Sequence, residues 1–555
     1  MTEHNERITK RVVSLIFITG LLLLIVLTQL IRWQFVHAAK LTNMAVQQRS
    51  LKAPLSPARG DIFDRNGNLL TNKTNMLALV VYPKLLRNLE TTFNLLQTTL
   101  KENFPFKTVK EFSKLNYYVK EIQVHHVSDL EKIEDDGLAI VSYPRRYRGD
   151  GFASHLLGYI NAADNRGEAG VELVFDRILK CEQPKYFLEA MLDGKGNLIR
   201  GTKYRLSKSN EQASQIYLTI DSRIQEIVEN AANRYITKGA IVVSDPRTGE
   251  ILGLVSRPTF VADRLEDYLS KPNSPFTNRA LSPYAPGSVY KIVVAAAALE
   301  ENLVSPDEVF HCPGYYELGE QRIKCHSYED GGHGDITFFD AMVYSCNTVF
   351  IEVGQRLGMK KLREYSERFG LGSITELNFP GEKPGNIPRD KYYSPGDLAN
   401  ISIGQGGLTA TPVQLLSVLN VIINDGMYKP LSYLYSIQKP GDDHVQPVMV
   451  LPGRQIISQI TAKSIQKMLE GVTVYGTGKQ ANLSYLRSAG KTGTAETGII
   501  GVNQVGISHA WFAGYFPAED PKYSIIVFVE GGMSGSNVAA PIFRRIMEEI
   551  SINLD

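Results

Sequence analysis

The chain has 555 residues, too long for a single hydrophobic core, so two or three domains are expected. Its 60 Lys and Arg residues nearly balance its 58 Asp and Glu residues, and the formal net charge is only +2. A nearly neutral chain lacks the basic field that nucleic-acid binding requires, and we expect no nucleic-acid partner.

An apolar segment near the N-terminus, Val12 to Ile31, contains no charged residue. About 20 apolar residues suffice for a helix to cross a bilayer. Arg7, Lys10 and Arg11 precede this segment, and cytoplasmic flanks are usually rich in such positive charges. We therefore predict a cytoplasmic tail at 1–11 and a transmembrane anchor at 12–37.

This topology predicts a single-pass protein of the cytoplasmic (inner) membrane, with the bulk of the chain on the outer, periplasmic side. The alternative is a cleaved secretory signal, for which Ala38-Ala39 offers small residues at a cleavage site.

The chain after the anchor changes character near Ile216. Residues 38–215 combine short strands and polar turns without a nucleophile–base spacing, and we interpret them as a pedestal. An alternating apolar pattern predicts a strand at 216–221, and apolar runs predict strands at 239–244, 250–256, 510–516 and 523–530, before a closing helix at 541–550. Strands at both ends with helices between them predict an α+β domain at 216–555, with a central antiparallel sheet flanked by helices.

The first chemical motif is Ser-x-x-Lys at Ser288 and Lys291, which follows a Pro-Gly turn and begins an apolar helix. A serine at a helix start lies near free backbone N–H groups that favour negative charge. The spacing of three places Lys291 on the same face, and burial there would lower its pKa, as a general base requires. A second match, Ser464 to Lys467, is interpreted as a helix surface.

Two further motifs follow along the chain. Ser345-Cys-Asn347 offers a hydroxyl that can relay a proton and an amide that can bind a substrate carbonyl. The third motif offers a cation and hydroxyl groups for a substrate carboxylate, on residues Lys491, Thr492, Gly493 and Thr494. The same three motifs occur in this order in penicillin-binding proteins and class A β-lactamases.

With these motifs the chain resembles a class B penicillin-binding protein, and the resemblance runs from the anchor almost to the C-terminus. Flanking strings also match, at residues 59–67, 218–221, 285–291, 404–415 and 509–514. Residues 331–335 (GGHGD) resemble the elongation type, penicillin-binding protein two, and the division type is the alternative.

The resemblance implies a peptidoglycan D,D-transpeptidase that cross-links stem peptides in cell elongation and shape, with a possible carboxypeptidase side activity. Peptides ending in D-Ala-D-Ala and β-lactams would both acylate the enzyme. The implied roles are nucleophile for Ser288, general base for Lys291, proton shuttle for Ser345, donor binding for Asn347, carboxylate binding for Lys491 and Thr492, and an oxyanion hole from the N–H groups of Ser288 and Thr494.

No large glycosyltransferase region precedes the pedestal, so the resemblance implies a separate membrane-embedded glycan polymerase and other cell-wall elongation proteins as partners. Catalysis at a serine requires no cofactor. A membrane-anchored β-lactamase is the nearest rival, because Glu382 and Asn386 reproduce the Glu-x-x-x-Asn pattern of a deacylating loop. An antibiotic sensor and a scaffold without activity are further alternatives.

Three of the cysteines lie close together in the sequence and admit three interpretations. A structural zinc would be bound by Cys312, Cys325, His333 and Cys346, a set of suitably soft ligands. Outside the cytoplasm a Cys312–Cys325 disulfide is the alternative, and free thiols are the third. Spare ligands for a metal are His311, His326 and Asp335.

Overall fold

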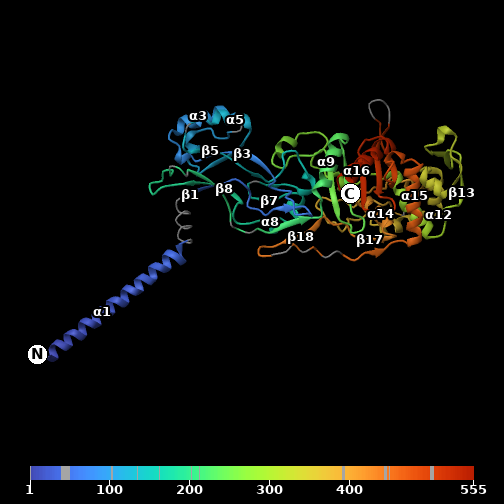
Figure 1. Ribbon diagram of the computed structural model, residues 1–555. Helices are drawn as coiled ribbons and strands as arrows, with labels where there is room; N and C mark the ends of the chain where they lie inside the picture. The colour runs from blue at the N-terminus through green and yellow to red at the C-terminus, as the bar shows by residue number, and fades with distance from the viewer. Residues whose placement is uncertain are drawn as a thin grey trace. The chain divides into compact units, whose positions relative to one another are not determined.

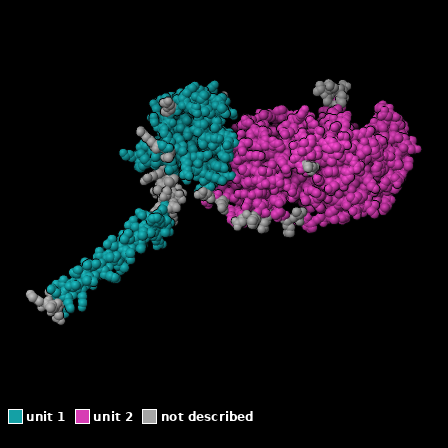
Figure 2. Space-filling model, viewed as in Figure 1, with its two compact units in different colours: residues 1–57, 75–144, 183–210 teal, residues 58–74, 145–182, 211–555 magenta. Residues whose placement is uncertain are grey.

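The computed structural model describes the chain except residues 1, 39–49, 102–103, 134, 162, 200, 202, 210, 212, 390–393, 443–444, 446, 449–450, 501–505 and 555. Two compact units are present (Figures 1 and 2). Unit 1 comprises residues 1–57, 75–144 and 183–210, and unit 2 comprises residues 58–74, 145–182 and 211–555. Each unit combines separate stretches of the chain. The limits 38–215 for the pedestal and 216–555 for the α+β domain therefore stay a prediction.

The N-terminal apolar segment is a continuous helix. Helix α1 (Thr2–Ile31) leads into a short π-helical turn, η1 (Arg32–Val36). The stretch Asn5–Val36 is long and apolar enough to cross a membrane, and its apolar side chains are not buried among the described residues. This helix is consistent with a single-pass anchor. Ala39, part of the alternative cleavage site, lies outside the described residues.

Unit 1 contains two small sheets. Strands β4 (Tyr118–Ile122), β3 (Thr74–Val81) and β5 (Leu138–Arg145) form the first, and an aromatic cluster that includes Phe93, Phe104 and Phe112 packs beside it. Helices α3 (Leu89–Leu100), α4 (Val109–Ser113) and α5 (Val124–Leu130) supply much of that cluster. The second sheet consists of β1 (Ser50–Pro54), β8 (Tyr186–Met191) and β9 (Tyr204–Lys208).

Unit 2 is organised around a five-stranded antiparallel sheet in the order β12-β11-β22-β21-β20. The strands are β11 (Gly239–Ser244), β12 (Ile251–Arg257), β20 (Ala489–Ile500), β21 (Gly506–Phe516) and β22 (Tyr523–Val529). Strand β11 pairs with β22, so the beginning and the end of the predicted domain meet in one sheet, as the sequence predicted.

Both faces of this sheet are buried, because successive side chains of a strand point to opposite sides. One face, with Ile241, Phe512 and Val527, packs against α9 (Ser222–Tyr235) and α16 (Ala540–Asn553). The other face, with Val242, Trp511 and Ile526, joins a large helical core. The helices of this core include α10 (Lys291–Glu300), α12 (Asn347–Arg368), α14 (Pro412–Ile423) and α15 (Gln459–Val474).

The expected α+β architecture is confirmed. The cysteine-rich segment contains the antiparallel pair β13 (Val309–Cys312) and β16 (Gly334–Thr337), and the hairpin β14 (Tyr315–Leu318) and β15 (Gln321–Lys324). Backbone pairing of these short strands holds the loops that carry the cysteines.

Candidate active site

Ser288 lies in a 3-10 turn, η6 (Gly287–Tyr290), that leads directly into α10. Gly287 has φ +55° and its N–H donates to the carbonyl oxygen of Gly404 at 2.9 Å. A Cβ at position 287 would lie 2.6 Å from the carbonyl oxygen of Thr494 on β20. Only glycine tolerates both this backbone conformation and this close approach. The nucleophile turn therefore lies directly beside β20.

Lys291 is fully buried, and its ammonium group is held by the second motif. Its Nζ donates to Ser345 O at 2.7 Å, to Asn347 Oδ1 at 2.7 Å and to Ser345 Oγ at 3.3 Å. Burial lowers the pKa of Lys291 to about 8, against a smaller raising effect of Cys346 and Cys325. Lys291 can thus lose its proton near neutral pH, as a general base must.

Among the described residues, Lys291 and Ser288 do not form a hydrogen bond with each other. Catalytic hydrogen bonds often tighten only when substrate binds, so this geometry does not exclude Lys291 as the base.

Ser345 connects the first and third motifs. It lies in a turn before α12 with φ +57°, an uncommon conformation for a residue other than glycine. Its Oγ accepts a hydrogen bond from Lys491 Nζ at 2.8 Å and the longer one from Lys291. Because both lysines donate to this oxygen, the hydroxyl proton of Ser345 is directed elsewhere. Such a hydroxyl can pass a proton to a leaving group.

Lys491 and Thr492 lie on β20, buried at 0% and 5% exposure. Burial and the positive charge of Lys291 lower the pKa of Lys491 well below its usual value. Two lysines that share one hydroxyl repel each other, and a substrate carboxylate would relieve this repulsion. Gly493 lets β20 approach η6, since a Cβ there would lie 2.9 Å from Val289 Cγ2.

Three residues that the sequence did not single out hold this strand in place. Gly535 N donates to Thr494 Oγ1 at 3.2 Å, and Gln405 Nε2 donates to Thr494 O at 3.3 Å. The hydroxyl groups of Thr477 and Thr492 form a hydrogen bond of 2.7 Å. Gln405 belongs to the family-like string 404–415, which could have indicated it. No sequence signal distinguished Thr477 or Gly535.

The β-lactamase-like pair Glu382 and Asn386 lies in a loop and makes local contacts. Glu382 Oε1 accepts the N–H of Thr375 at 3.0 Å, and Asn386 Nδ2 donates to Gly407 O at 2.6 Å. Burial raises the pKa of Glu382. Among the described residues neither side chain contacts Ser288, so the geometry favours a structural loop over a deacylating one.

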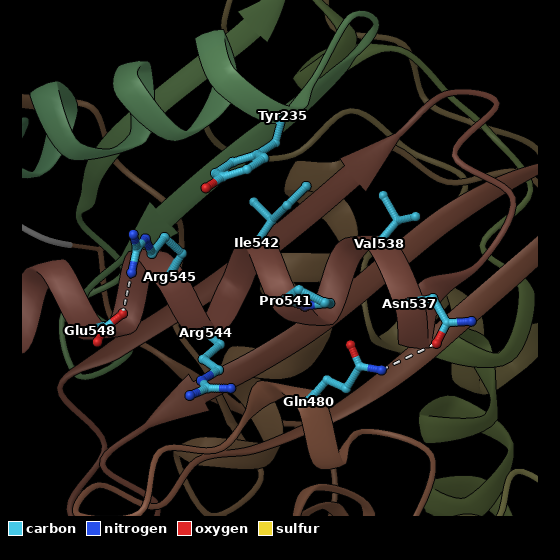
Figure 3. A pocket seen from close by; sticks show the side chains of 9 residues that line it. All are labelled: Tyr235, Gln480, Asn537, Val538, Pro541, Ile542, Arg544, Arg545 and Glu548. Carbon is cyan, nitrogen blue, oxygen red and sulfur yellow. Dashed lines mark hydrogen bonds and ion pairs between the residues drawn. The ribbon is translucent and has the colours of Figure 1, made fainter.

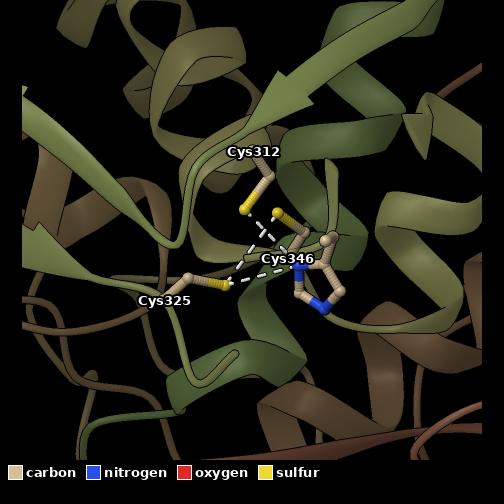
Figure 4. Close-up of side chains that lie close together, drawn as sticks. Cys312, Cys325 and Cys346 are labelled. Carbon is tan, nitrogen blue, oxygen red and sulfur yellow. Dashed lines mark hydrogen bonds between the residues drawn. The ribbon is translucent and has the colours of Figure 1, made fainter. Parts of the chain in front are cut away.

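The four predicted metal ligands converge, each from the end of a strand, a loop or a helix start (Figure 4). One ligand atom from each of Cys312, Cys325, His333 and Cys346 lies within 4.8 Å of the others. His333 Nδ1 is 3.5 Å from Cys312 Sγ and 3.7 Å from Cys325 Sγ, and Cys325 Sγ is 4.0 Å from Cys346 Sγ. Cys312, Cys325 and Cys346 are free thiols, so the Cys312–Cys325 disulfide is not formed.

The cluster favours thiolates, which are the metal-binding form. Hydrogen bonds from Cys346 lower the pKa of Cys312, to about 4, and of Cys325, while the pKa of Cys346 rises because it keeps the shared proton. His311 instead pairs with Asp335 at 2.7 Å on the surface, while the ring of the remaining spare ligand, His326, lies edge-on to that of His333.

A separate cavity of about 640 Å³ lies near α9 and α16 (Figure 3). Its lining combines Tyr235, Ile542 and Arg544 with two polar pairs, Arg545–Glu548 and Gln480–Asn537. None of the predicted site residues lines it.

Comparison with known families decides the assignment. Residues 239–548 match the family described as Penicillin binding protein transpeptidase domain, and residues 54–218 match Penicillin-binding Protein dimerisation domain. The chain belongs to the penicillin-binding protein transpeptidase family. The predicted family, fold class and enzyme class are thus confirmed, and the three motifs lie within the matched transpeptidase domain.

Relatives of this penicillin-binding protein span nearly its whole length. Stage V sporulation protein D of Bacillus subtilis is 33% identical over 99% of this chain and 86% of its own. Peptidoglycan D,D-transpeptidase MrdA of Haemophilus influenzae is 26% identical over 96% of this chain and 91% of its own. A solved structure described as "Structural coordination of polymerization and crosslinking by a peptidoglycan synthase complex" aligns with TM-score 0.67 and 25% identity, over 97% of this chain and 98% of that one.

Proposed function

We propose that this penicillin-binding protein is a membrane-anchored serine D,D-transpeptidase of the elongation type. The observation that carries the proposal is that Lys291 and Lys491 both donate hydrogen bonds to Ser345, and that Lys291 also donates to Asn347, beside the Ser288 turn. This arrangement provides a nucleophile, a buried amine of lowered pKa, a shared hydroxyl and a cation for a carboxylate.

The first half-reaction acylates the enzyme. Ser288 Oγ attacks the carbonyl carbon of the penultimate D-Ala while Lys291 takes the hydroxyl proton. The N–H groups of Ser288 and Thr494 stabilise the oxyanion. Collapse breaks the peptide bond, Ser345 delivers its proton to the departing amine of the terminal D-Ala, and Lys291 passes the proton taken from Ser288 on to Ser345 Oγ. Lys491 and Thr492 hold the carboxylate of that D-Ala until it leaves.

The second half-reaction transfers the acyl group to a neighbouring stem peptide. An amine of the acceptor attacks the Ser288 ester, Lys291 or Ser345 accepts the proton released, and Ser288 Oγ regains a proton as the ester bond breaks. A β-lactam would enter by the same first step and remain bound as an ester.

The direct test is covalent labelling of the full-length protein in detergent with a fluorescent penicillin, followed by intact mass. We expect one adduct per wild-type chain and none on Ser288→Ala. Ser464→Ala is the matched control, because it removes the serine of the other Ser-x-x-Lys sequence. Labelling that survives Ser288→Ala would refute the assignment, and loss of label within minutes would favour a β-lactamase.

Two relationships support the elongation role and a polymerase partner. Relatives named MrdA are peptidoglycan D,D-transpeptidases, and the aligned solved structure comes from a peptidoglycan synthase complex. A division-type role is the second candidate. Depletion in the native cell separates them: rounded cells support elongation, whereas filaments support division.

The proposed topology places residues 1–11 in the cytoplasm and residues after the anchor outside. Protease added to spheroplasts should digest unit 2 but spare an N-terminal tag. Protection of unit 2 would contradict this orientation.

We also propose that Cys312, Cys325, His333 and Cys346 hold a structural zinc. Tetrahedral zinc with bond lengths of about 2.3 Å to sulfur and about 2.0 Å to nitrogen separates its ligands by about 3.5–3.8 Å. The distances of 3.5, 3.7 and 4.0 Å in the cluster fit this set. Asn347 N donates to Cys325 Sγ at 3.4 Å, so a bound metal would brace the second motif from behind.

Metal analysis tests this site without reference to catalysis. We expect about one zinc per chain in the wild type and in Cys181→Ser, the control outside the cluster, but little in Cys325→Ser. Metal-free protein with two thiols fewer and a mass lower by about 2 Da would instead support the disulfide.

A further inference from the structure

Thr477 lies between two of the catalytic motifs without belonging to either. It follows helix α15 and the residue Tyr475, in a short segment that ends at η9 (Lys479–Ala481). On one side, Thr477 N donates to the carbonyl oxygen of Val343 at 3.3 Å. Val343 ends α11 (Phe338–Val343), only two residues before Ser345. On the other side, the Thr477 hydroxyl lies 2.7 Å from that of Thr492.

The segment that carries Thr477 is tightly packed. A Cβ on Gly476 would lie 2.4 Å from the carbonyl oxygen of Val343, and one on Gly478 would lie 3.0 Å from Val472 Cγ1. The hydroxyl of Tyr475 donates to Asp340 Oδ1 at 3.0 Å, on the same helix α11. These contacts fix the Thr477 backbone, so its hydroxyl keeps one position relative to β20.

The hydrogen bond between two hydroxyl groups can run in either direction, and a substrate decides which. Each hydroxyl has one proton to donate and lone pairs to accept with. A carboxylate is only an acceptor. When Thr492 donates its proton to the terminal carboxylate of the donor peptide, it can only accept from Thr477. Thr477 must then be the donor.

We propose that Thr477 is a positioning residue that directs the Thr492 hydroxyl proton toward the carboxylate of the donor peptide or β-lactam. By donating to Thr492 Oγ1, Thr477 holds that oxygen in one rotamer and leaves its proton free for the ligand. Hydrogen bonds in such a chain polarise one another, so the bond from Thr492 to the carboxylate is strengthened as well. This inference rests on the proposed role of Thr492 in carboxylate binding.

The test compares ligands that differ only in the carboxylate. Acylation efficiency at Ser288 is measured with a penicillin and with its methyl ester, on wild type, Thr477→Val and Thr477→Ser. We expect Thr477→Val to lose about tenfold with the free acid, the usual scale for one hydrogen bond to a charged system, and to change less than twofold with the ester. Thr477→Ser retains the hydroxyl and should restore most of the loss.

The matched control is Thr497→Val on β20, the strand that carries Thr492. This change removes a hydroxyl that donates to Ile507 O at 2.7 Å. It should leave the ratio of acid to ester efficiency unchanged. The proposal would be overturned if Thr477→Val lowered the acylation efficiency equally with the acid and the ester, or with neither of them. A wild type that is not labelled at Ser288 at all would overturn the proposed active site itself, and is thereby distinguished from failure of this inference alone.

Discussion

The lowered pKa of Lys291 predicts how acylation depends on pH. Burial lowers this pKa to about 8 from an ordinary value of 10.5. With a pKa of about 8, about one chain in ten carries the neutral amine at pH 7 and about nine in ten at pH 9. With an ordinary pKa, the fraction at pH 7 would be only about one in 3000. Since only the neutral amine can accept the Ser288 proton, the acylation rate constant should rise about tenfold between pH 7 and pH 9.

The assay is the rate of fluorescent penicillin labelling at saturating ligand from pH 6 to pH 10. Saturation matters because Lys491 also has a lowered pKa, and loss of its charge at high pH weakens carboxylate binding. That effect raises the half-saturating concentration and leaves the rate at saturation unchanged. Lys291→Gln is the control. Any labelling that remains in this variant should have a rate constant with no inflection near pH 8. A wild-type rate constant that is flat over this range, or that inflects near pH 10, would refute Lys291 as the base.

Three further predictions concern stability and packing. Lys291→Met should abolish labelling yet raise the free energy of unfolding at pH 7 by up to about 3 kcal/mol, because a fall in pKa from 10.5 to about 8 costs about 1.4 kcal/mol per pKa unit. The gain in free energy of unfolding should shrink as the pH rises from 8 to 10.5, because the lysine of the unfolded chain also loses its charge there. Urea denaturation of wild type and Lys291→Met near pH 7 and near pH 10.5 checks this direction. Glu172→Gln should destabilise unit 2 by about 3–5 kcal/mol, since the fully buried carboxylate of Glu172 pairs with two buried arginines, and an unchanged denaturation midpoint would contradict it. Gly287→Ala should lose labelling without global unfolding, because the added Cβ meets the backbone of β20. Penicillin labelling tests the loss of activity, and circular dichroism tests whether the fold is retained.

Local sequence patterns were sufficient for the elements and for most of the candidate site. The apolar run at 12–31 determines a helix by composition alone. The spacing of Ser288 and Lys291 and the apolar runs of β11, β21 and β22 are short-range patterns, and the structure has the helix and strands where they predict them.

Tertiary packing decided which residues meet. Sequence could not show that Lys291 and Lys491 share one hydroxyl of Ser345, or that Thr477 contacts Thr492, because these contacts join distant segments and have no local period. The same holds for residues 58–74, which pack in unit 2 although they lie within the predicted pedestal. Strand β2 (Ile62–Phe63) pairs there with β10 (Gln215–Leu218), a parallel pairing that no turn specifies.

The cysteine cluster depends on both levels. Sequence supplied the ligand types and their proximity along the chain, but it left zinc, a disulfide and free thiols open. The pairing of β13 with β16, together with the start of α12, brings the sulfur atoms and the imidazole of His333 within 4.8 Å of one another. Ligand identity is a property of the sequence, whereas ligand geometry depends on how separate backbone segments pack, because that packing alone sets the distances between the atoms.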